Sequence, residues 1–583
     1  MAEVNLVSLT IDNVSTRVAK SFTVLEAAKT VNVDIPTLCY LKGINEIGAC
    51  RVCMVEVGES ATLKAACVTP VEEGMVIKTN TQRIRSSRRE VLKLTLASHN
   101  RECTTCIRSR SCELQTMAED LGVEEINYPN RKTLREIDDR SDAIVRDNSK
   151  CILCGRCVNV CRDVQGVGVL DFTQRGIDTH VTTPFNLGLE DTPCISCGQC
   201  VTACPVGALK EKEEMERVWQ ALEDPNKHVV VQAAPAIRAA LGEEFGLPMG
   251  TLVTGKMVSA LKRLGFGKVF DTNFGADLTV LLEGQELLSR LQGNGPLPMI
   301  TSCSPGWVNF CEFYYPEMLP HISSCKSPQS IVGALVKSEY AQKNNIDPKN
   351  IFTVSIMPCT AKKVEVKRAE LAVDGNPDVD AVLTTRELAK MIKQAGLSFL
   401  KLPEEEFDAD LGDFVGIGVI AGTTGGIMEA TLRFTAAALG EDSISELEFH
   451  SVRGVDGIKE TVVQMAGRQI AIAVAHGTGN AAKLMTMIKN GEKNYHFVEI
   501  MGCSGGCVAG GGQPHVSAHV RMKQDIRVER AKALYQEFAI KNAKRQDNPL
   551  VNRIMDPAII ARLEHLCHTH YHARKKFSLR SEE

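Results

Sequence analysis

The sequence has no run of the roughly 20 uninterrupted apolar residues that a membrane-spanning helix requires. Its charge is nearly balanced, with 67 basic and 71 acidic side chains and a net charge of -4, so it has no general attraction to nucleic acid. Residues 1–13 lack the basic flank, apolar core and cleavage site of a secretory signal. We therefore predict a cytoplasmic protein that neither spans a membrane nor binds nucleic acid.

Loops that bind nucleotides are also missing from the sequence. No G-x-G-x-x-G loop opens a helix, and there is no Walker A loop. Residues 416–422 contain glycines at the wrong spacing, and their apolar pattern predicts a strand. We therefore expect nicotinamide and flavin to bind elsewhere than on this chain.

Cysteine, in contrast, is abundant, with 22 residues in a chain of 583. Fifteen of them precede residue 205, and the next cysteine after Cys204 is Cys303. Clustered cysteines in a cytoplasmic protein are more often metal ligands than disulfides. The spacing predicts a series of small metal-dependent modules followed by one larger domain, within a length that suits roughly four domain-sized units.

Residues 1–80 form the first predicted module. Alternating residues indicate a strand at its start, and Thr23 with Glu26 forms a capping box that opens a short helix. Four cysteines around a single C-x2-C pair suit a 2Fe-2S cluster, since each iron needs two sulfur ligands. A structural zinc is the alternative, but zinc modules favour two such pairs. The predicted ligands are Cys39, Cys50, Cys53 and Cys67.

Residues 81–139 carry one histidine and three cysteines. Taken alone, this set is equally typical of zinc and of an iron–sulfur cluster. Beside other iron–sulfur modules, a 4Fe-4S cluster with one imidazole ligand is favoured. The predicted ligands are His99, Cys103, Cys106 and Cys112.

Residues 140–212 contain the run C-x2-C-x2-C-x3-C twice, which is the pattern of a bacterial ferredoxin with two 4Fe-4S clusters. In that pattern the fourth cysteine of each run binds the other cluster. Four clusters in series along these modules predict a path for single electrons that leads to a redox catalyst. The two ligand sets are Cys151, Cys154, Cys157 and Cys204, and Cys194, Cys197, Cys200 and Cys161.

Residues 213–583 read as an α/β domain with mostly buried strands. Predicted strands over 299–301, 351–356 and 497–501 each run into a loop that contains cysteine. Ligands gather at the carboxyl ends of strands in α/β sheets, so three such loops argue against ordinary buried cysteines. We assign Cys311, Cys325 and Cys567 to the ordinary buried class, and we expect the histidine-rich tail after residue 564 to be a surface helix.

The three cysteine loops have distinctive sequences: TSCSPGW at 301–307, MPCTAKK at 357–363 and EIMGCSGGCVAGGGQP at 499–514. They resemble the signature loops of iron-only (FeFe) hydrogenases, and the preceding modules resemble the type with four accessory clusters. The resemblance implies a β-grasp first module and a two-lobed α/β catalytic domain around an H-cluster. That cofactor is a 4Fe-4S cluster joined to a two-iron unit with CO, cyanide and azadithiolate, and it interconverts protons and hydrogen.

The resemblance also implies roles for individual residues. Cys507 would bridge the two parts of the H-cluster, and Lys362 would pair with a cyanide ligand. Protons would pass from Cys303 to Glu283, then through Ser323 to Glu286; without the resemblance, the two glutamates could belong to a solvated helix face. The other implied cluster ligands are Cys359 and Cys503, and the implied pocket-lining residues are Ala234, Pro235, Gln329, Met357 and Met501.

One loop departs from the family pattern, which is usually T-S-C-C-P. Here Cys303 keeps the relay position, and Ser304 replaces a cysteine that ligates the cluster. Ser304 could bind iron as an alkoxide, Cys303 could shift into the ligand position, or the cluster could be altered. We expect an intact relay at Cys303 with a weaker or substituted fourth bond, because serine is a poorer iron ligand than cysteine.

The Ser304 variant and the tail sequence HTHYHARKK at 568–576 resemble multi-subunit NAD(P)-linked hydrogenases, some of them electron-bifurcating. Flavin and NAD(P) would then bind partner subunits. A stand-alone enzyme that uses ferredoxin is a variant of this hypothesis. The electron-entry subunit of a complex-I-like dehydrogenase is a different hypothesis, but it should lack the three cysteine loops. A hydrogen sensor should carry a signalling domain, and none is visible here.

Overall fold

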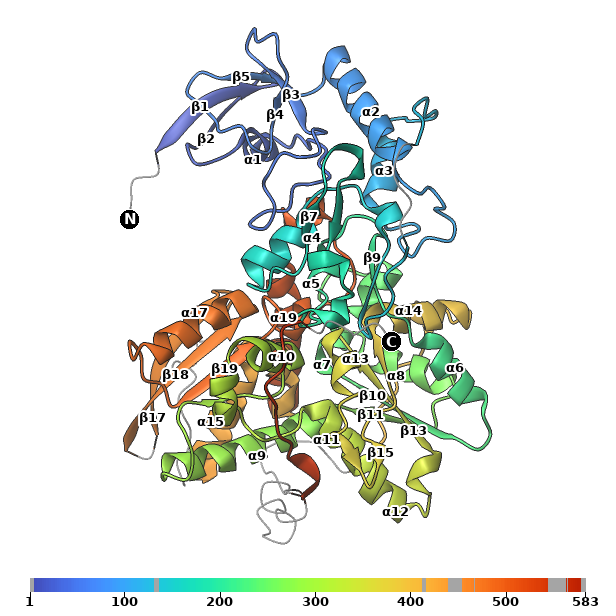
Figure 1. Ribbon diagram of the computed structural model, residues 1–583, viewed down its shortest axis with the longest axis vertical. Coiled ribbons are helices and arrows are strands. Elements are labelled where there is room, and N and C mark those ends of the chain that lie inside the picture. The colour runs from blue at the N-terminus through green and yellow to red at the C-terminus, as the bar shows by residue number, and fades with distance from the viewer. Residues whose placement is uncertain are drawn as a thin grey trace.

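The computed structural model describes residues 5–130, 136–411, 416–438, 453–465, 467–543, 563 and 565–577. Figure 1 shows small N-terminal modules stacked on a larger body of two lobes. The predicted fold class, an α/β catalytic domain preceded by small iron–sulfur modules, is confirmed. No helix in the described part of the chain is long and apolar enough to cross a membrane.

The first module is a five-stranded sheet with strand order β2-β1-β5-β3-β4. The predicted capping box is present at α1 (Val24–Thr30), because Thr23 accepts the Glu26 N–H and the Glu26 carboxylate accepts the Thr23 N–H. The buried face of α1 packs on the sheet and closes a small apolar core. The strands are β1 (Leu6–Ile11), β2 (Val14–Ala19), β3 (Met54–Val57), β4 (Lys64–Ala65) and β5 (Val76–Lys78).

Two helices and a ferredoxin-like unit follow. Helix α2 (Gln82–Ala97) ends just before His99, and Cys112 is the N-cap of α3 (Glu113–Asp120). Each cysteine run contains a short helix, α4 (Arg156–Asn159) or α5 (Gln199–Ala203). Two small antiparallel pairs complete this unit: β6 (Ile144–Arg146) with β9 (Leu209–Glu211), and β7 (Asp171–Thr173) with β8 (His180–Thr182).

Two four-stranded sheets build the lobes of the catalytic part. One has the order β11-β10-β13-β16 and is parallel; the other has the order β12-β19-β18-β17 and carries β17 antiparallel at its edge. The three strands with cysteine loops are divided between these sheets. Their bounds are β10 (His228–Ala233), β11 (Lys268–Asp271), β13 (Ile351–Met357) and β16 (Ala381–Thr384), then β12 (Met299–Ile300), β17 (Ile458–Met465), β18 (Arg468–His476) and β19 (Phe497–Met501).

Helices cover both sheets, and several of them begin beside the strand ends. They include α6 (Met215–Glu223), α9 (Asn273–Leu291), α10 (Pro305–Tyr314), α11 (Pro328–Leu335), α13 (Ala361–Glu365), α15 (Gly426–Ala438) and α19 (Ile526–Ala543).

Two local predictions are wrong. The segment predicted as a strand at 416–422 forms the 3-10 helix η11 (Ile417–Gly422), because the Asp277 carboxylate on α9 accepts the N–H groups of Gly416 and Gly418. The tail is not a surface helix over its described residues 565–577: there the helical part is a short turn around His565, and the chain from His568 runs extended along the 323–326 segment. Its backbone hydrogen bonds to that segment replace helical ones.

Candidate functional site

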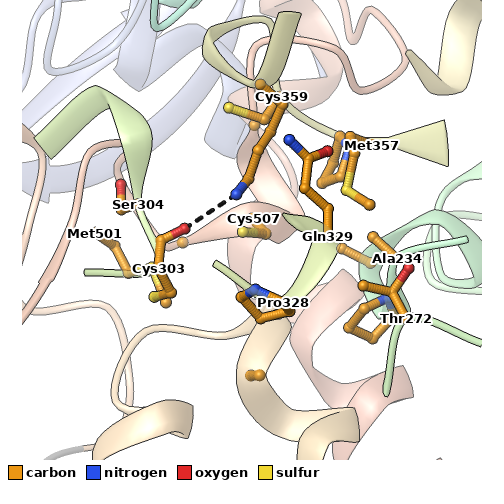
Figure 2. A pocket seen from close by; sticks show the side chains of 18 of the residues that line it. Ala234, Thr272, Cys303, Ser304, Pro328, Gln329, Met357, Cys359, Met501 and Cys507 are labelled. Carbon is orange, nitrogen blue, oxygen red and sulfur yellow. Dashed lines mark hydrogen bonds between the residues drawn. The ribbon is translucent and has the colours of Figure 1, made fainter. Parts of the chain in front are cut away.

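One cavity lies where the loops after strands of both catalytic sheets meet (Figure 2). It encloses about 780 Å³ of space that protein atoms do not fill, and its wall is mainly apolar. Every residue that the sequence placed in the catalytic pocket lies on this wall. They are Ala234, Pro235, Cys303, Ser304, Gln329, Met357, Cys359, Lys362, Met501, Cys503 and Cys507.

Three thiols approach the cavity from the two lobes. Cys359 follows β13, whereas Cys503 and Cys507 follow β19. Burial, and then the nearby Cys359, raises the pKa of the Cys507 thiol to about 12. Burial, followed by Cys359, Cys197 and Cys507, raises the pKa of Cys503 well above its ordinary value. Buried thiols gathered in this way suit a shared metal cluster, whose binding replaces their protons.

Lys362 is a cation held at the edge of this apolar wall. Its Nζ donates to the backbone carbonyl of Cys303 at 3.3 Å, the bond drawn in Figure 2, and pairs with the Glu365 carboxylate at 2.8 Å. Gln329 also donates to Glu365, at 2.6 Å. Lys362 is only 8% exposed, so an anionic ligand in the cavity would meet a poorly hydrated positive charge.

Ser304 occupies the N-cap of α10 but does not cap it. A serine at this position usually accepts an N–H from its own helix, yet no such bond forms here. Instead, its Oγ accepts the Gly502 N–H at 3.0 Å, from the loop that carries Cys503. The hydroxyl is therefore directed to the side of the cavity where the three thiols lie.

The predicted proton-relay residues lie on a line from the cavity to the surface. Burial raises the pKa of Cys303 well above its ordinary value, with nearby Glu283 as the next cause. Glu283 is fully buried on α9, and burial raises its pKa to about 8. Its Oε1 accepts from Ser302, and within the described residues Oε2 has no hydrogen-bond partner.

The outer part of this line is directly hydrogen-bonded. Ser323 Oγ donates to Glu286 Oε2 at 2.7 Å, and Glu286 Oε1 is paired with Arg290 at 2.5 Å. Glu283 bonds to Ser302, and the structure gives no direct bond from it to Ser323. Glu283 and Glu286 are three positions apart and therefore lie on the same face of α9. The inner part of the predicted route, at Glu283, is thus next to the outer part, at Glu286.

Several residues on the cavity wall were missed by sequence reasoning. Thr272 follows β11 and is buried, with its hydroxyl donating to Gln232. Ala421, Gly422 and Ile427 reach the wall from η11 and the start of α15. The mistaken strand prediction at 416–422 hid this segment, and the glycines around it were the available signal.

The first ferredoxin-like site is a second cavity, of about 450 Å³. Its wall carries three thiols of the first run and one thiol of the second, the set predicted to share a cluster. Burial is the main cause that raises the pKa of Cys154, and Cys204 and Cys151 are among its neighbours. The four thiols are Cys151, Cys154, Cys157 and Cys204.

The second ferredoxin-like site gathers the other crossed set. Burial, and then Cys197, Cys194 and Cys161, raises the pKa of Cys200. This site adjoins the catalytic cavity, since Cys359 also contributes to the raised pKa of Cys197 after burial. A Cβ on Gly511 would lie 2.3 Å from the Cys197 carbonyl oxygen, so glycine there allows the two backbones to touch.

The two N-terminal modules both contact the first ferredoxin-like site. In the 2Fe-2S module, Asn45 Nδ2 donates to the carbonyls of Cys39 and Cys154, at 2.6 and 3.0 Å. In the histidine module, Arg108 donates to the carbonyl of Cys204 at 3.4 Å. The predicted single series of sites is therefore wrong: both modules meet the same site, and the arrangement is a fork.

The ligands within these two modules are also gathered. Cys53 Sγ lies 3.3 Å from Cys67 Sγ, and the Cys50 N–H points to Cys39 Sγ at 3.4 Å. His99 and Cys112 are both buried, and they flank the loop that carries the other two predicted ligands. The thiol-rich donor sets of both modules fit iron–sulfur clusters.

Comparison with protein families gives a match for each part of the chain. Residues 227–511 match the C-terminal domain of the iron only hydrogenase large subunit. Residues 5–82 match a 2Fe-2S iron-sulfur cluster binding domain, and residues 88–127 match the iron-sulfur binding region of NADH-ubiquinone oxidoreductase-G. Residues 150–208 match a 4Fe-4S dicluster domain.

Individual relatives match nearly the whole chain. The NADP-reducing hydrogenase subunit HndD of Solidesulfovibrio fructosivorans is 45% identical, over 98% of this chain and 100% of that relative. Iron hydrogenase 1 of Clostridium pasteurianum is 43% identical, over 91% and 92% of the two chains. A solved structure of an apo FeFe-hydrogenase from Chlamydomonas reinhardtii is 40% identical, covers 61% of this chain and 99% of that one, and has a TM-score of 0.52.

Proposed function

Because this chain belongs to the iron-only (FeFe) hydrogenase family, as its three cysteine loops predicted, we propose that it interconverts hydrogen with protons and electrons at an H-cluster. The observation that carries the proposal is the convergence of Cys359, Cys503 and Cys507 on one apolar cavity. A dehydrogenase electron-entry subunit would not need this convergence.

The protein residues around the cavity have separate tasks. Cys359, Cys503 and Cys507 would hold the cofactor, with Cys507 as the bridge between its two parts. The H-cluster, when bound, supplies the iron chemistry that makes and splits hydrogen. Lys362 would hold an anionic cyanide ligand through its ammonium group. The apolar wall, which includes Met357 and Met501, excludes water that would compete for protons.

Ser304 would be the fourth protein ligand of the 4Fe-4S part. Support comes from its hydroxyl, which leaves its own helix uncapped and accepts the Gly502 N–H. An N–H donor and a helix N-terminus both stabilise negative charge, so they favour the alkoxide form of serine. Cys303 then stays available as the inner proton carrier.

Proton transfer is assigned to the buried line that starts at Cys303. A carboxyl whose pKa is about 8 is protonated at neutral pH and can give up its proton within the working range, as Glu283 can. Ser323 and Glu286 would carry the proton onward, and their 2.7 Å hydrogen bond supports that order.

Electrons would leave through the accessory sites. We assign one 2Fe-2S and three 4Fe-4S clusters to the parts 1–80, 81–139 and 140–212, with the catalytic part at 213–583. The fork gives two exits from the first ferredoxin-like site, which suits partner subunits that carry flavin and reduce NAD(P), or a ferredoxin. A cytoplasmic location belongs to the proposal, because none of the 22 cysteines forms a disulfide.

Infrared spectroscopy of the fully matured protein tests the function. Bands from metal-bound CO and cyanide, together with hydrogen evolution from a reduced dye, are the expected result. Cys303→Ala should keep the bands and lose turnover, whereas Cys311→Ala, a buried cysteine outside the cavity, should keep both. A matured protein without these bands would refute the hydrogenase assignment.

A further inference from the structure

The proposed proton line reaches Glu286, whose side chain is only 16% exposed and whose two oxygens both accept hydrogen bonds. Both Nε and Nη2 of Arg290 donate to Glu286 Oε1, at 3.1 and 2.5 Å. Ser323 Oγ and the Ser324 N–H donate to Oε2, at 2.7 and 3.2 Å. Arg290 is mostly buried and does not release protons at any working pH. A second carrier beside Glu286 would therefore speed the exchange of its proton with solvent.

The hydroxyl of Ser324 offers the next step. Its Oγ lies 3.5 Å from Glu286 Oε2 and 2.8 Å from Nδ1 of His568. His568 comes from the C-terminal tail, 244 residues further along the chain. Its side chain is half-buried, so the imidazole connects the partly buried Glu286 carboxylate to water through a single hydroxyl.

The position of this imidazole is fixed by backbone contacts on both sides. Cys325 and His568 form an antiparallel bridge. The Lys326 N–H donates to the Cys567 carbonyl at 2.6 Å, and the Thr569 N–H donates to the Ser324 carbonyl at 2.7 Å. The tail is thus paired with the same short segment that supplies Ser323 and Ser324, which holds His568 in line with the route.

We propose that His568 is the outer proton carrier of this chain and that it exchanges protons between solvent and Glu286 through Ser324. The inference rests on the proposed hydrogenase function. In hydrogen oxidation, Glu286 gives a proton to Ser324 Oγ while the Ser324 hydroxyl proton moves to His568 Nδ1. The imidazolium then loses its Nε2 proton to water, and a flip of the ring turns the unprotonated nitrogen back towards Ser324 before the next transfer. Each hydrogen molecule sends two protons along this route while two electrons leave through the iron–sulfur sites.

Histidine suits this task better than the other polar groups nearby. Its ordinary pKa lies close to neutral pH, so it takes up and releases protons readily there. Groups that face it or its segment include Glu286 and Arg290 of α9 and Lys326, which pairs with Asp378. Tyr571 donates its hydroxyl to the Ser323 carbonyl and serves to anchor the tail.

The test compares His568→Asn with His570→Asn in the complete, matured protein. Asparagine can accept the Ser324 hydrogen bond but cannot carry a proton. We expect His568→Asn to lower hydrogen oxidation and evolution about tenfold or more. Added imidazole should restore most of the rate. His570 is exposed in the same tail, and its variant should match the wild type with or without imidazole.

Two further measurements separate proton transfer from anchoring. Ser324→Ala should show a similar loss without imidazole rescue, because its break lies inside the protein. Hydrogen exchange of the 323–326 amides should be unchanged in His568→Asn. A wild-type rate in His568→Asn would overturn the inference, and so would a loss that imidazole does not restore. Missing CO and cyanide bands in the wild type would instead refute the hydrogenase function itself.

Discussion

The ferredoxin-like unit contains the same cysteine run twice, and the two copies face different parts of the molecule. The second cysteine of the first copy is followed by Gly155 and Arg156, and that of the second copy by Gly198 and Gln199. Both glycines have left-handed backbone angles, with φ of 82° and 68°, and both begin a short helix. In each copy, the second cysteine is therefore followed by a glycine and then by a residue with a long side chain.

The first copy joins three modules through a charge. Arg156 is only 1% exposed, and its guanidinium donates to the carbonyls of Cys39 and Tyr40, at 3.3 and 3.1 Å. The same group makes a two-pronged pair with Glu113, at 2.9 and 3.0 Å. One side chain thus connects the 2Fe-2S module, the histidine module and the first ferredoxin-like site.

At the matching position, the second copy meets the catalytic part with an uncharged side chain. Gln199 Nε2 donates to the Ala509 carbonyl at 3.1 Å. A Cβ on Gly198 would lie 2.4 Å from Thr360 Oγ1 and 3.0 Å from the Gly511 Cα, so this junction depends on close backbone packing. The difference shows that the same position of a duplicated motif can carry an ion-pairing arginine on the electron-carrier side and a neutral, closely packed glutamine beside the catalytic cavity.

The largest effect is expected from a test of whether the fourth cysteine of each run binds the cluster of the other run. Cys204→Ala lies in the second copy but should remove the cluster of the first copy, because its thiol lines that cavity. We expect the loss of one 4Fe-4S electron paramagnetic resonance signal and about four iron atoms per chain. Cys311→Ala, buried but outside every predicted ligand set, should keep all of the iron. Loss of the signal next to the catalytic part, instead of the signal at the fork, would contradict the crossing.

Arg156→Gln should have the next largest effect. It leaves the partly buried Glu113 carboxylate and two backbone carbonyls without their donor, and breaking a buried pair costs about 3–5 kcal/mol, which is an upper bound here. Hydrogen exchange at residues 39–48 should rise as the 2Fe-2S module loosens. Arg162→Gln removes an exposed pair with Asp163 and should leave exchange unchanged. Equal exchange in both variants would show that Arg156 does not hold the junction.

Sequence reasoning succeeded where chemistry is local. The capping box at Thr23 and the three cysteine loops follow from short patterns, and the buried strands before those loops follow from their apolar residues. These features depend on neighbours within a few positions. The polar pattern on α9 was less informative, because Glu283 is fully buried although a solvated face was possible.

Prediction from the sequence failed where contacts between distant segments determine the structure. Nothing in the spacing of Asn45 predicts its bond to the Cys154 carbonyl, 109 positions away, so the fork was missed. The mistaken strand at 416–422 has the same cause, since Asp277 on another helix captures its N–H groups. The link from His568 to Ser324 was likewise invisible, because two partners 244 positions apart leave no local pattern.

The two glycines give a matched pair of smaller changes. Gly198→Ala puts a methyl group against Thr360 and the Gly511 backbone, and residue 198 itself has a left-handed backbone conformation. We therefore expect this variant to destabilise the catalytic junction by about 2–4 kcal/mol. Gly155→Ala carries the same backbone strain, but its methyl group would meet the flexible tip of Ile47 at 3.0 Å, so we expect about 1–2 kcal/mol. Hydrogen exchange on each side of the two junctions measures both values. A larger destabilisation by Gly155→Ala than by Gly198→Ala would contradict the proposal that the catalytic junction is the more tightly packed of the two.

Gln199→Ala should have the smallest effect of these changes. Together with Gln199→Glu, it tests whether the second junction requires an uncharged side chain at residue 199. It removes one neutral hydrogen bond and leaves the Ala509 carbonyl unpaired, which costs about 1 kcal/mol. Exchange at residues 507–512 should rise slightly, while the iron content stays complete. Gln199→Glu has almost the same shape but places a carboxylate against that carbonyl and near the thiols, so it should disturb the junction more than alanine does. If alanine and glutamate behaved alike, packing alone would hold the second copy, and the neutrality of its side chain would have no part in the contrast with Arg156.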